Sequence, residues 1–266
     1  MTFRLSLAAT FIALMFVSPV FSAPRKPNVV LIYTDDQGSV DVNCYGADDL
    51  ITPNMDGLVK DGIRFTQFYS AAPVCSPSRA ALLTGRFPQR AGLATNAGSK
   101  KGSVGMPSEQ VTLAEMLRGA GYATGHVGKW HLGTSPDFHP QQRGFDEFFG
   151  FLDGGHSYHM GLPNIVFPDR TGAGQDFGSL MEGNILRGTE SVEESEYLTD
   201  AFGREAVSFI ERQQADPFCL YLSFNAVHTP MPADDVRLAK FAAIQAPDLH
   251  SNAALTVPMD DAMQRA

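Results

Sequence analysis

Three residues at alternate positions, Cys75, Pro77 and Arg79, form the most informative chemical pattern of the sequence. A zinc site needs paired Cys or His ligands, and a disulfide framework needs more than the three cysteines of this chain. Residues 78–83 read as the start of a helix that ends at Gly85. The N–H groups and dipole at a helix N-terminus favour a bound anion. The pattern therefore predicts chemistry on an anion beside Cys75.

Two adjacent carboxylates, Asp35 and Asp36, follow the apolar run 28–33, which is rich in β-branched residues. Such a run predicts a central strand that is covered on both faces. Successive strand residues point to opposite faces, so both carboxylates can face one point only if the strand has ended. They could merely satisfy amides in a turn. The carboxyl end of a buried strand is also where ligands bind to α/β sheets, and carboxylates suit Ca²⁺.

Basic residues follow two other expected strands. The strand 122–127 leads to Lys129 and His131, and the apolar strand 218–224 leads to His228. Each residue alone is more often a solvated or hydrogen-bonded side chain than a catalytic one. Among the other histidines, His156 and His159 lie in the loop-rich stretch 134–195 and could face a substrate.

The remaining pattern alternates helices with strands, which predicts an α/β fold with a mostly parallel central sheet and helices on both faces. Thr52 and Thr112 are the expected N-caps of two helices. The expected elements are a helix from Pro53 to Asp61, a strand over 63–69, a helix over 113–119, a helix over 197–213 and a helix that begins at Met259.

Composition and charge restrict the class of protein. The chain has 266 residues, of which 44% are hydrophobic, and one large domain or most of one is expected. A net charge of −9 argues against general nucleic-acid binding.

Residues 1–23 predict a cleaved secretory signal peptide, because one basic residue, a short apolar run and small residues occur in that order. A retained membrane anchor is the alternative, although the apolar run is short for a span. No other segment is long and apolar enough to cross a bilayer. An exported protein is expected, in the periplasm or outside the cell. We expect no structural disulfide among Cys44, Cys75 and Cys219, since three is an odd number and Cys219 lies in an apolar strand.

Taken together, these segments resemble the type I sulfatase family, and the resemblance covers nearly all of the chain after the signal peptide. Any one match is weak, but five occur in the family's order. The matching segments are 35–36, 75–79, 128–131, 144–150 and 225–230. The resemblance implies the fold shared by sulfatases and alkaline phosphatases.

The resemblance also implies a modified nucleophile. Cys75 would be oxidised to formylglycine by a formylglycine-generating enzyme that reads Cys75, Pro77 and Arg79. Asp35, Asp36 and residue 75 would hold a Ca²⁺ ion. The aldehyde hydrates to a diol, of which one oxygen attacks sulfur and the other re-forms the aldehyde to expel sulfate.

Further roles follow by resemblance for the basic residues. Arg79 would hold the oxygens of residue 75, and Lys129 would bind a sulfate oxygen. His131 would accept the proton of the diol, and His228 would interact with the leaving oxygen. The expected reaction is the hydrolysis of sulfate monoesters, with a sulfated carbohydrate as the expected substrate.

The sequence departs from the family in one respect. The family has two further calcium ligands, an adjacent Asp and Asn on a later strand, and no Asp-Asn pair occurs in these 266 residues. Residues 24–266 are therefore expected to form the N-terminal part of a catalytic domain, without its remaining strands and C-terminal domain, and to be weakly active at best.

Two other functions remain open from the sequence. A phosphoester hydrolase of the alkaline-phosphatase-like group would share the sheet and the aspartates, but it typically uses Ser or Thr as nucleophile. A non-catalytic binder of sulfated glycans would keep the anion pocket and leave Cys75 as a thiol.

Overall fold

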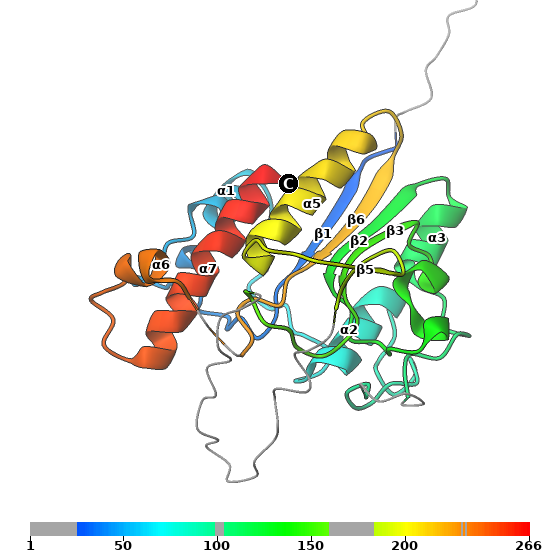
Figure 1. Cartoon of the computed structure of the whole chain (residues 1–266), viewed down its shortest axis with the longest axis horizontal. Coiled ribbons are helices and arrows are strands. Elements are labelled where there is room, and N and C mark those ends of the chain that lie inside the picture. The colour runs from blue at the N-terminus through cyan, green and yellow to red at the C-terminus, as the bar shows by residue number, and fades with distance from the viewer. Residues whose placement is uncertain (1–25, 99–103, 160–183, 230, 232) are drawn as a thin grey trace, which may run out of the picture.

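A mixed sheet of six strands forms the centre of the computed structural model, which describes residues 26–98, 104–159, 184–229, 231 and 233–266 (Figure 1). The strand order is β1-β6-β2-β3-β4-β5. The first four strands run parallel to one another, whereas β4 pairs antiparallel with both β3 and β5. The strands are β1 (Val29–Tyr33), β2 (Ala123–Lys129), β3 (Glu147–Phe151), β4 (Ile185–Arg187), β5 (Glu190–Val192) and β6 (Phe218–Ser223). This architecture confirms the α/β fold with a mostly parallel sheet.

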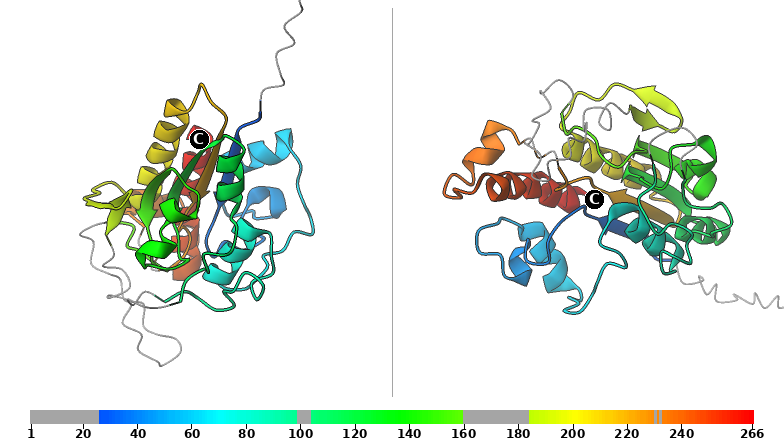
Figure 2. Two further views of the ribbon diagram at one scale, coloured as in Figure 1. Left: turned by 90° about the vertical axis from the view of Figure 1, so that its right-hand side faces the viewer. Right: turned by 90° about the horizontal axis from the view of Figure 1, so that it is seen from below.

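Helices cover both faces of the sheet, as the two views of Figure 2 show. The α-helices are α1 (Pro53–Asp61), α2 (Cys75–Thr84), α3 (Leu113–Gly119), α5 (Leu198–Arg212), α6 (Asp235–Ala239) and α7 (Pro247–Arg265), and the 3₁₀ helices are η1 (Asn43–Tyr45), η2 (Pro136–Phe138) and η3 (Pro140–Arg143). Because side chains alternate along β6, Leu220 and Leu222 join the core under α5 and α7. Tyr221 points the other way and joins the core under α2 and α3.

The helix starts show which caps the sequence predicts correctly. Thr112 caps α3 in a capping box with Glu115, as expected. Thr52 precedes α1, but its side chain makes no capping bond. Asp260 of α7 accepts from the backbone N–H groups of Asn54 and Met55 instead, at 3.1 and 2.8 Å. The cap of α1 therefore comes from a distant helix.

The expected strand over 63–69 is wrong, because these residues form no strand in the structure. The alternation that favours a strand is present, but its side chains are not packed on a face: Ile63 is 82% exposed and Phe65 is 61% exposed. Helix α7 begins at Pro247, well before the expected start at Met259, and α6 lies where no element is expected. The short strand β3 lies in the stretch 134–195, where loops with short elements are expected.

Strand β1 lies at an edge of the sheet and not at its centre as expected. It pairs with β6 on one side, and among the described residues no strand pairs with its other side. Val30 is 38% exposed in consequence. The other residues of β1 are partly buried, and the apolar run does not encode how many lateral neighbours the strand has.

The expected signal peptide, residues 1–23, lies outside the described residues. Within the described part of the chain, no helix combines the length and apolarity that a membrane crossing requires. Cys44, Cys75 and Cys219 are all free thiols, and Cys219 is buried.

Candidate active site

The carboxyl ends of β1, β2 and β6 meet at one edge of the sheet, and the N-terminus of α2 lies beside them. Tyr33 of β1 and Gly128 of β2 both pair with Ser223 of β6, so the three strands end level with one another. The segments that follow carry Asp35 and Lys129 into one place. This is the position at which α/β sheets bind ligands.

Asp35 lies between two buried cations. Lys129 Nζ is 2.5 Å from Asp35 Oδ2, and Arg79 Nη2 is 3.6 Å from the same oxygen. Burial alone would raise the pKa of Asp35, but the charges of Arg79 and Lys129 outweigh it, so the pKa is lowered. One carboxylate thus faces two cations, and the three groups carry an excess of positive charge.

Cys75 is the first residue of α2, so its side chain lies at the N-terminal end of that helix. Its Sγ is 3.6 Å from Asp35 Oδ1 and 3.4 Å from Lys129 Nζ. Burial raises the pKa of the thiol despite the nearby Lys129. The turn is held by Ser76, whose N–H donates to Asn96 and whose hydroxyl accepts from the N–H of Ala97. As a thiol, residue 75 is therefore not activated.

Arg79 is fully buried on the next turn of α2, under the same site. Its Nη1 donates to the carbonyl oxygen of Lys129 at 2.8 Å, and its guanidinium lies 5.3 Å from the ring centre of Tyr33. Ser223 Oγ donates to that same carbonyl at 2.7 Å. Within the described residues, Nε and Nη2 of Arg79 have no hydrogen-bond partner. A buried guanidinium with spare donors is suited to an anion.

His131 follows Lys129 by two residues and is almost completely buried. It adopts a positive φ of 54°, which turns the chain after β2. Burial and the charges of Lys129 and Arg79 lower its pKa to about 3, so the imidazole is neutral and can accept a proton. Its Nδ1 is buried without a hydrogen-bond partner among the described residues.

His228 lies in the segment that follows β6. Its Nε2 is 3.7 Å from Asp36 Oδ2. The backbone of this segment is joined to the end of β1, because Asp35 N–H donates to Ala226 O at 2.9 Å and Val227 N–H donates to Asp35 O at 2.7 Å. Asp36 has a positive φ of 58° and a side chain that is 61% exposed, which turns it away from Asp35.

Three side chains are close enough to share a cation: the ligand atoms of Asp35, Cys75 and His228 lie within 4.8 Å of one another. Ca²⁺ prefers oxygen ligands, so the Asp35 carboxylate is suitable, whereas the Cys75 thiol and the His228 imidazole are not. Asp36, the other expected calcium ligand, is not one of the three, and its exposed carboxylate lies beside His228. An oxygen-bearing group in place of the Cys75 sulfur would make residue 75 suitable as well. The residues therefore fit Ca²⁺ only after such a change.

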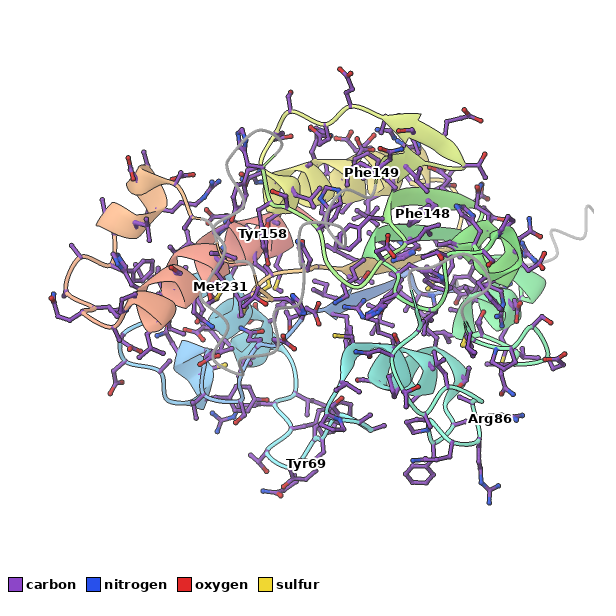
Figure 3. All side chains as sticks on the ribbon, turned by 60° about the horizontal axis from the view of Figure 1, so that its bottom comes forward. Tyr69, Arg86, Phe148, Phe149, Tyr158 and Met231 are labelled. Carbon is purple, nitrogen blue, oxygen red and sulfur yellow. The ribbon has the colours of Figure 1, made fainter. Side chains whose placement is uncertain are left out.

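A cavity of about 710 Å³ opens beside these residues and is lined by Asp35, Asp36 and Cys75. Residues 68–74 and 85–87 form much of its wall, whereas Lys129, His131 and His228 do not line it. Tyr69 and Arg86 are both seen at the surface in Figure 3. A small anionic group held at Cys75 would leave room in this cavity for the rest of a larger molecule.

The structure brings the predicted residues of three strand ends and one helix into one cluster, namely Asp35, Asp36, Cys75, Arg79, Lys129, His131 and His228. Pro77 is buried within α2. His156 is buried and packs against the ring of Phe151 at 5.1 Å. Ser223 and Tyr158 also contact the cluster but were not predicted. Ser223 is the last residue of β6, so the expectation that polar residues at strand ends form the site applies to it as well. No sequence pattern predicts a role for Tyr158.

Comparison with known proteins identifies the family. The sulfatase family profile matches residues 27–265. The chain is 41% identical over 230 residues to the N-acetylgalactosamine-6-sulfatase of Sus scrofa, covering 80% of this chain and 42% of that protein. The chain thus spans less than half the length of this relative.

Solved structures agree. The crystal structure of Ps i-CgsB, also solved in complex with k-i-k-neocarrahexaose, matches with a TM-score of 0.80 and 38% identity over 91% of this chain and 54% of that one. BT4656, solved in complex with its substrate D-glucosamine-2-N,6-O-disulfate, matches with a TM-score of 0.65 and 29% identity over 84% of this chain and 39% of that one. Together with the profile match, these likenesses show that the chain belongs to the sulfatase family.

Proposed function

We propose that this protein hydrolyses sulfate esters of carbohydrates, with a nucleophile made from Cys75. The observation that carries the proposal is the environment of Cys75, which lies 3.4 Å from buried Lys129 at the N-terminus of α2. Arg79, with two unpartnered guanidinium nitrogens among the described residues, adds a second buried cation. A sulfate group is a compact anion whose hydrolysis builds up charge on its oxygens, and preorganised cations stabilise that charge.

The state of Cys75 supports its conversion to formylglycine. A reactive cysteine needs a lowered pKa, because the thiolate is the nucleophile. Here burial raises the pKa of the thiol, and its S–H lies against the carboxylate of Asp35. Conversion would supply a hydrated aldehyde with two hydroxyl groups on one carbon. One hydroxyl can attack sulfur, and loss of the proton from the other can expel the sulfate.

Two histidines are suited to the proton transfers. Burial and the charges of Lys129 and Arg79 lower the pKa of His131 to about 3, so the free imidazole is neutral and a weak base. The negative charge of a bound sulfate group would raise this pKa, and we propose that His131 then accepts the proton that the hydrated residue 75 loses. His228 lies at the mouth of the site beside Asp36, with Nε2 3.7 Å from that carboxylate. We propose that His228 gives a proton to the leaving oxygen. Lys129 would hold a sulfate oxygen, and Arg79 would hold the oxygens of the converted residue 75.

Ca²⁺ would be held by Asp35, Asp36 and the oxygens of the converted residue 75. When bound, the ion would polarise a sulfate oxygen and lower the pKa of the attacking hydroxyl. The orientation of Asp35 supports its part in this assignment, whereas the Asp36 carboxylate, which is exposed and faces His228, would have to turn inward. Asp35 turns Oδ1 toward residue 75 and Oδ2 toward Lys129, so Oδ1 remains available to a cation.

The substrate class is inferred from the relatives and the cavity. One relative is an N-acetylgalactosamine-6-sulfatase, and BT4656 was solved with a sulfated glucosamine as its substrate. The cavity of about 710 Å³ beside Cys75 has room for a sugar ring next to the sulfate. A secretory signal peptide over residues 1–23 would export the protein to the compartment where sulfated polysaccharides occur. A formylglycine-generating enzyme in the host would convert Cys75.

The state of Cys75 in the protein made by its native host tests the proposal. Mass spectrometry of the Cys75 peptide should find an aldehyde in place of the thiol, whereas the Cys219 peptide in the same digest should keep its thiol. An intact Cys75 thiol in the native-host protein contradicts the proposed nucleophile and favours a binder of sulfated glycans.

Rates with an aryl sulfate and the matched aryl phosphate test the reaction class. We expect the sulfate to be the better substrate, and Cys75→Ala should abolish its turnover. Faster turnover of the phosphate would identify a phosphoester hydrolase instead.

A further inference from the structure

The segment from Asn225 to His228 is held at both ends by one tyrosine. Tyr158 Oη lies 2.7 Å from Asn225 O and 2.8 Å from His228 O, and it donates to these carbonyls. The hydroxyl has a single proton, so the two carbonyls share it. The segment closes on itself through the bond from His228 N–H to Asn225 O, at 2.9 Å. Tyr158 therefore fixes the backbone of the residue that carries the His228 imidazole.

Tyr158 is itself held rigidly. It is 1% exposed and belongs to the core cluster formed with residues of β6, α5 and α7. Its carbonyl accepts from Leu198 N–H at 2.7 Å, at the start of α5, and its ring stacks on Tyr197 with centres 5.6 Å apart. Burial raises the pKa of Tyr158 far above the usual range, so the hydroxyl remains a donor. Tyr158 thus links the backbone of His228 to the start of α5.

The same segment also contacts the other side of the site. Asp35 exchanges two backbone hydrogen bonds with Ala226 and Val227. The end of β1, the segment after β6 and the start of α5 are therefore joined around Tyr158. Loss of the phenol would leave the Asp35 bonds in place, together with the bonds from His228 N–H to Asn225 O and between His228 Nδ1 and Thr229 O. It would remove the one described hydrogen bond to His228 O and so loosen the His228 end of the segment.

We propose that Tyr158 is a positioning residue that sets where the His228 imidazole meets the leaving oxygen of the substrate. The inference rests on the proposed function, in which His228 protonates that oxygen. A proton donor matters most when the leaving group is a poor one. An alkoxide from a sugar needs the proton, whereas a nitrophenolate leaves readily without it. The proposal therefore predicts an effect that depends on the leaving group.

The test is the substitution Tyr158→Phe, which removes the hydroxyl and keeps the ring on Tyr197. For N-acetylgalactosamine 6-sulfate, kcat should fall about tenfold, the loss expected from one misplaced hydrogen-bonding group. For 4-nitrophenyl sulfate, kcat should fall about twofold or less. Tyr45→Phe is the matched control, because Tyr45 Oη also donates to a main-chain carbonyl, that of Phe65, at 2.9 Å. The control should leave the ratio of the two rates unchanged.

A second readout does not need turnover. Carbethoxylation of His228 by diethyl pyrocarbonate, followed by peptide mass spectrometry, reports how freely the imidazole moves. The rate at His228 should rise about fivefold in Tyr158→Phe, while the rate at His250 in the same sample stays constant. His250 is held elsewhere, by Leu238 O at 2.7 Å.

The outcomes separate the two proposals. If wild-type protein with converted Cys75 turns over neither sulfate, the proposed function fails, and the carbethoxylation rate alone decides the role of Tyr158. Where turnover is measurable, the ratio of rates decides. If Tyr158→Phe lowers kcat equally on both substrates, Tyr158 is a packing residue and the proposal is wrong. In a protein without turnover, an unchanged rate of carbethoxylation at His228 would lead to the same conclusion. A urea titration of each variant shows that it is folded at the assay temperature.

Discussion

Lys129 Nζ lies 2.5 Å from Asp35 Oδ2, and both side chains are buried. Arg79 lies 3.6 Å from the same oxygen, so a single carboxylate compensates two cations. Buried ion pairs are stable only when their charges and hydrogen bonds are satisfied. The surplus positive charge makes this buried group less stable than a neutral ion pair, and it favours the binding of an anion. Two predictions follow from this imbalance.

The first prediction concerns whether Asp35 or Lys129 contributes more to the free energy of unfolding. Asp35→Asn leaves Lys129 and Arg79 buried without a counter-charge, so it should lower the free energy of unfolding by about 3–5 kcal/mol. Lys129→Met leaves Asp35 paired with Arg79 and should lower it by clearly less. Urea unfolding of the two variants measures this order. Equal losses, or a larger loss for Lys129→Met, would show that Asp35 and Arg79 do not form an effective pair.

The second prediction concerns anion binding. Inorganic sulfate should raise the thermal midpoint of the wild-type protein, because binding to the folded state alone stabilises it by about 2.7 kcal/mol at 100 times the dissociation constant. In Lys129→Met this gain should largely disappear. Sodium chloride at equal ionic strength serves as the control. A similar gain with chloride would indicate general screening and not a site for sulfate.

The ends of the strands are the part of this site that the sequence predicts best. Lys129 ends β2, whereas Asp35 and His228 lie a few residues after β1 and β6, and parallel strands deliver such residues to one edge. The role of Ser223 is harder to see, because a serine that ends a strand is common. Nothing in the spacing of Tyr158 predicts its contacts with Asn225 and His228, since these depend on the path of a loop between distant elements.

The third prediction concerns the close approach of β2 and β6. A Cβ at Gly128, which has a φ of 117°, would lie 1.9 Å from Ser223 O. Gly46 has a similar φ of 111° and no atom within 4 Å of that point. Both Ala variants suffer backbone strain of about 1–3 kcal/mol, but only Gly128→Ala also pushes the strands apart. Gly128→Ala should therefore unfold at much lower urea than Gly46→Ala. Equal midpoints would contradict the packing of these strands.

The fourth prediction concerns pH. His126 is completely buried among aromatic rings, and Ser223 Oγ lies 2.9 Å from its Nε2. Burial and the charge of Arg79 hold the pKa of His126 well below 6.5. Below that pH the unfolded chain binds a proton that the folded protein does not, so stability falls as the pH falls. From pH 7 to pH 5 this group should account for up to about 2 kcal/mol of the loss.

The substitution His126→Phe tests the sign. It also removes the bond to Ser223, so the absolute stability changes, and the informative quantity is the difference in unfolding free energy between pH 7 and pH 5. That difference should shrink in the variant. Part of it should remain, because the lowered pKa of His131 acts in the same direction over this range. An unchanged difference would show that His126 titrates alike in both states.

The sequence predicts local structure where the signal is local. The capping box of Thr112 with Glu115 and the apolar runs of β1 and β6 are examples. The wrong predictions concern segments whose structure depends on contacts with residues far away in the sequence. The alternation over 63–69 has no neighbouring strand or core in the described structure, and the cap of α1 comes from Asp260, which is far along the chain. Composition cannot encode such partners.

The open side of β1 has a consequence for the site itself. Among the described residues no strand pairs with that side, and β1 ends at Tyr33, two residues before Asp35. The backbone of Asp35 is therefore joined to the sheet from the β6 side alone, through its hydrogen bonds with Ala226 and Val227. The carboxylate that compensates Lys129 and Arg79 thus takes its position from the segment that also carries His228.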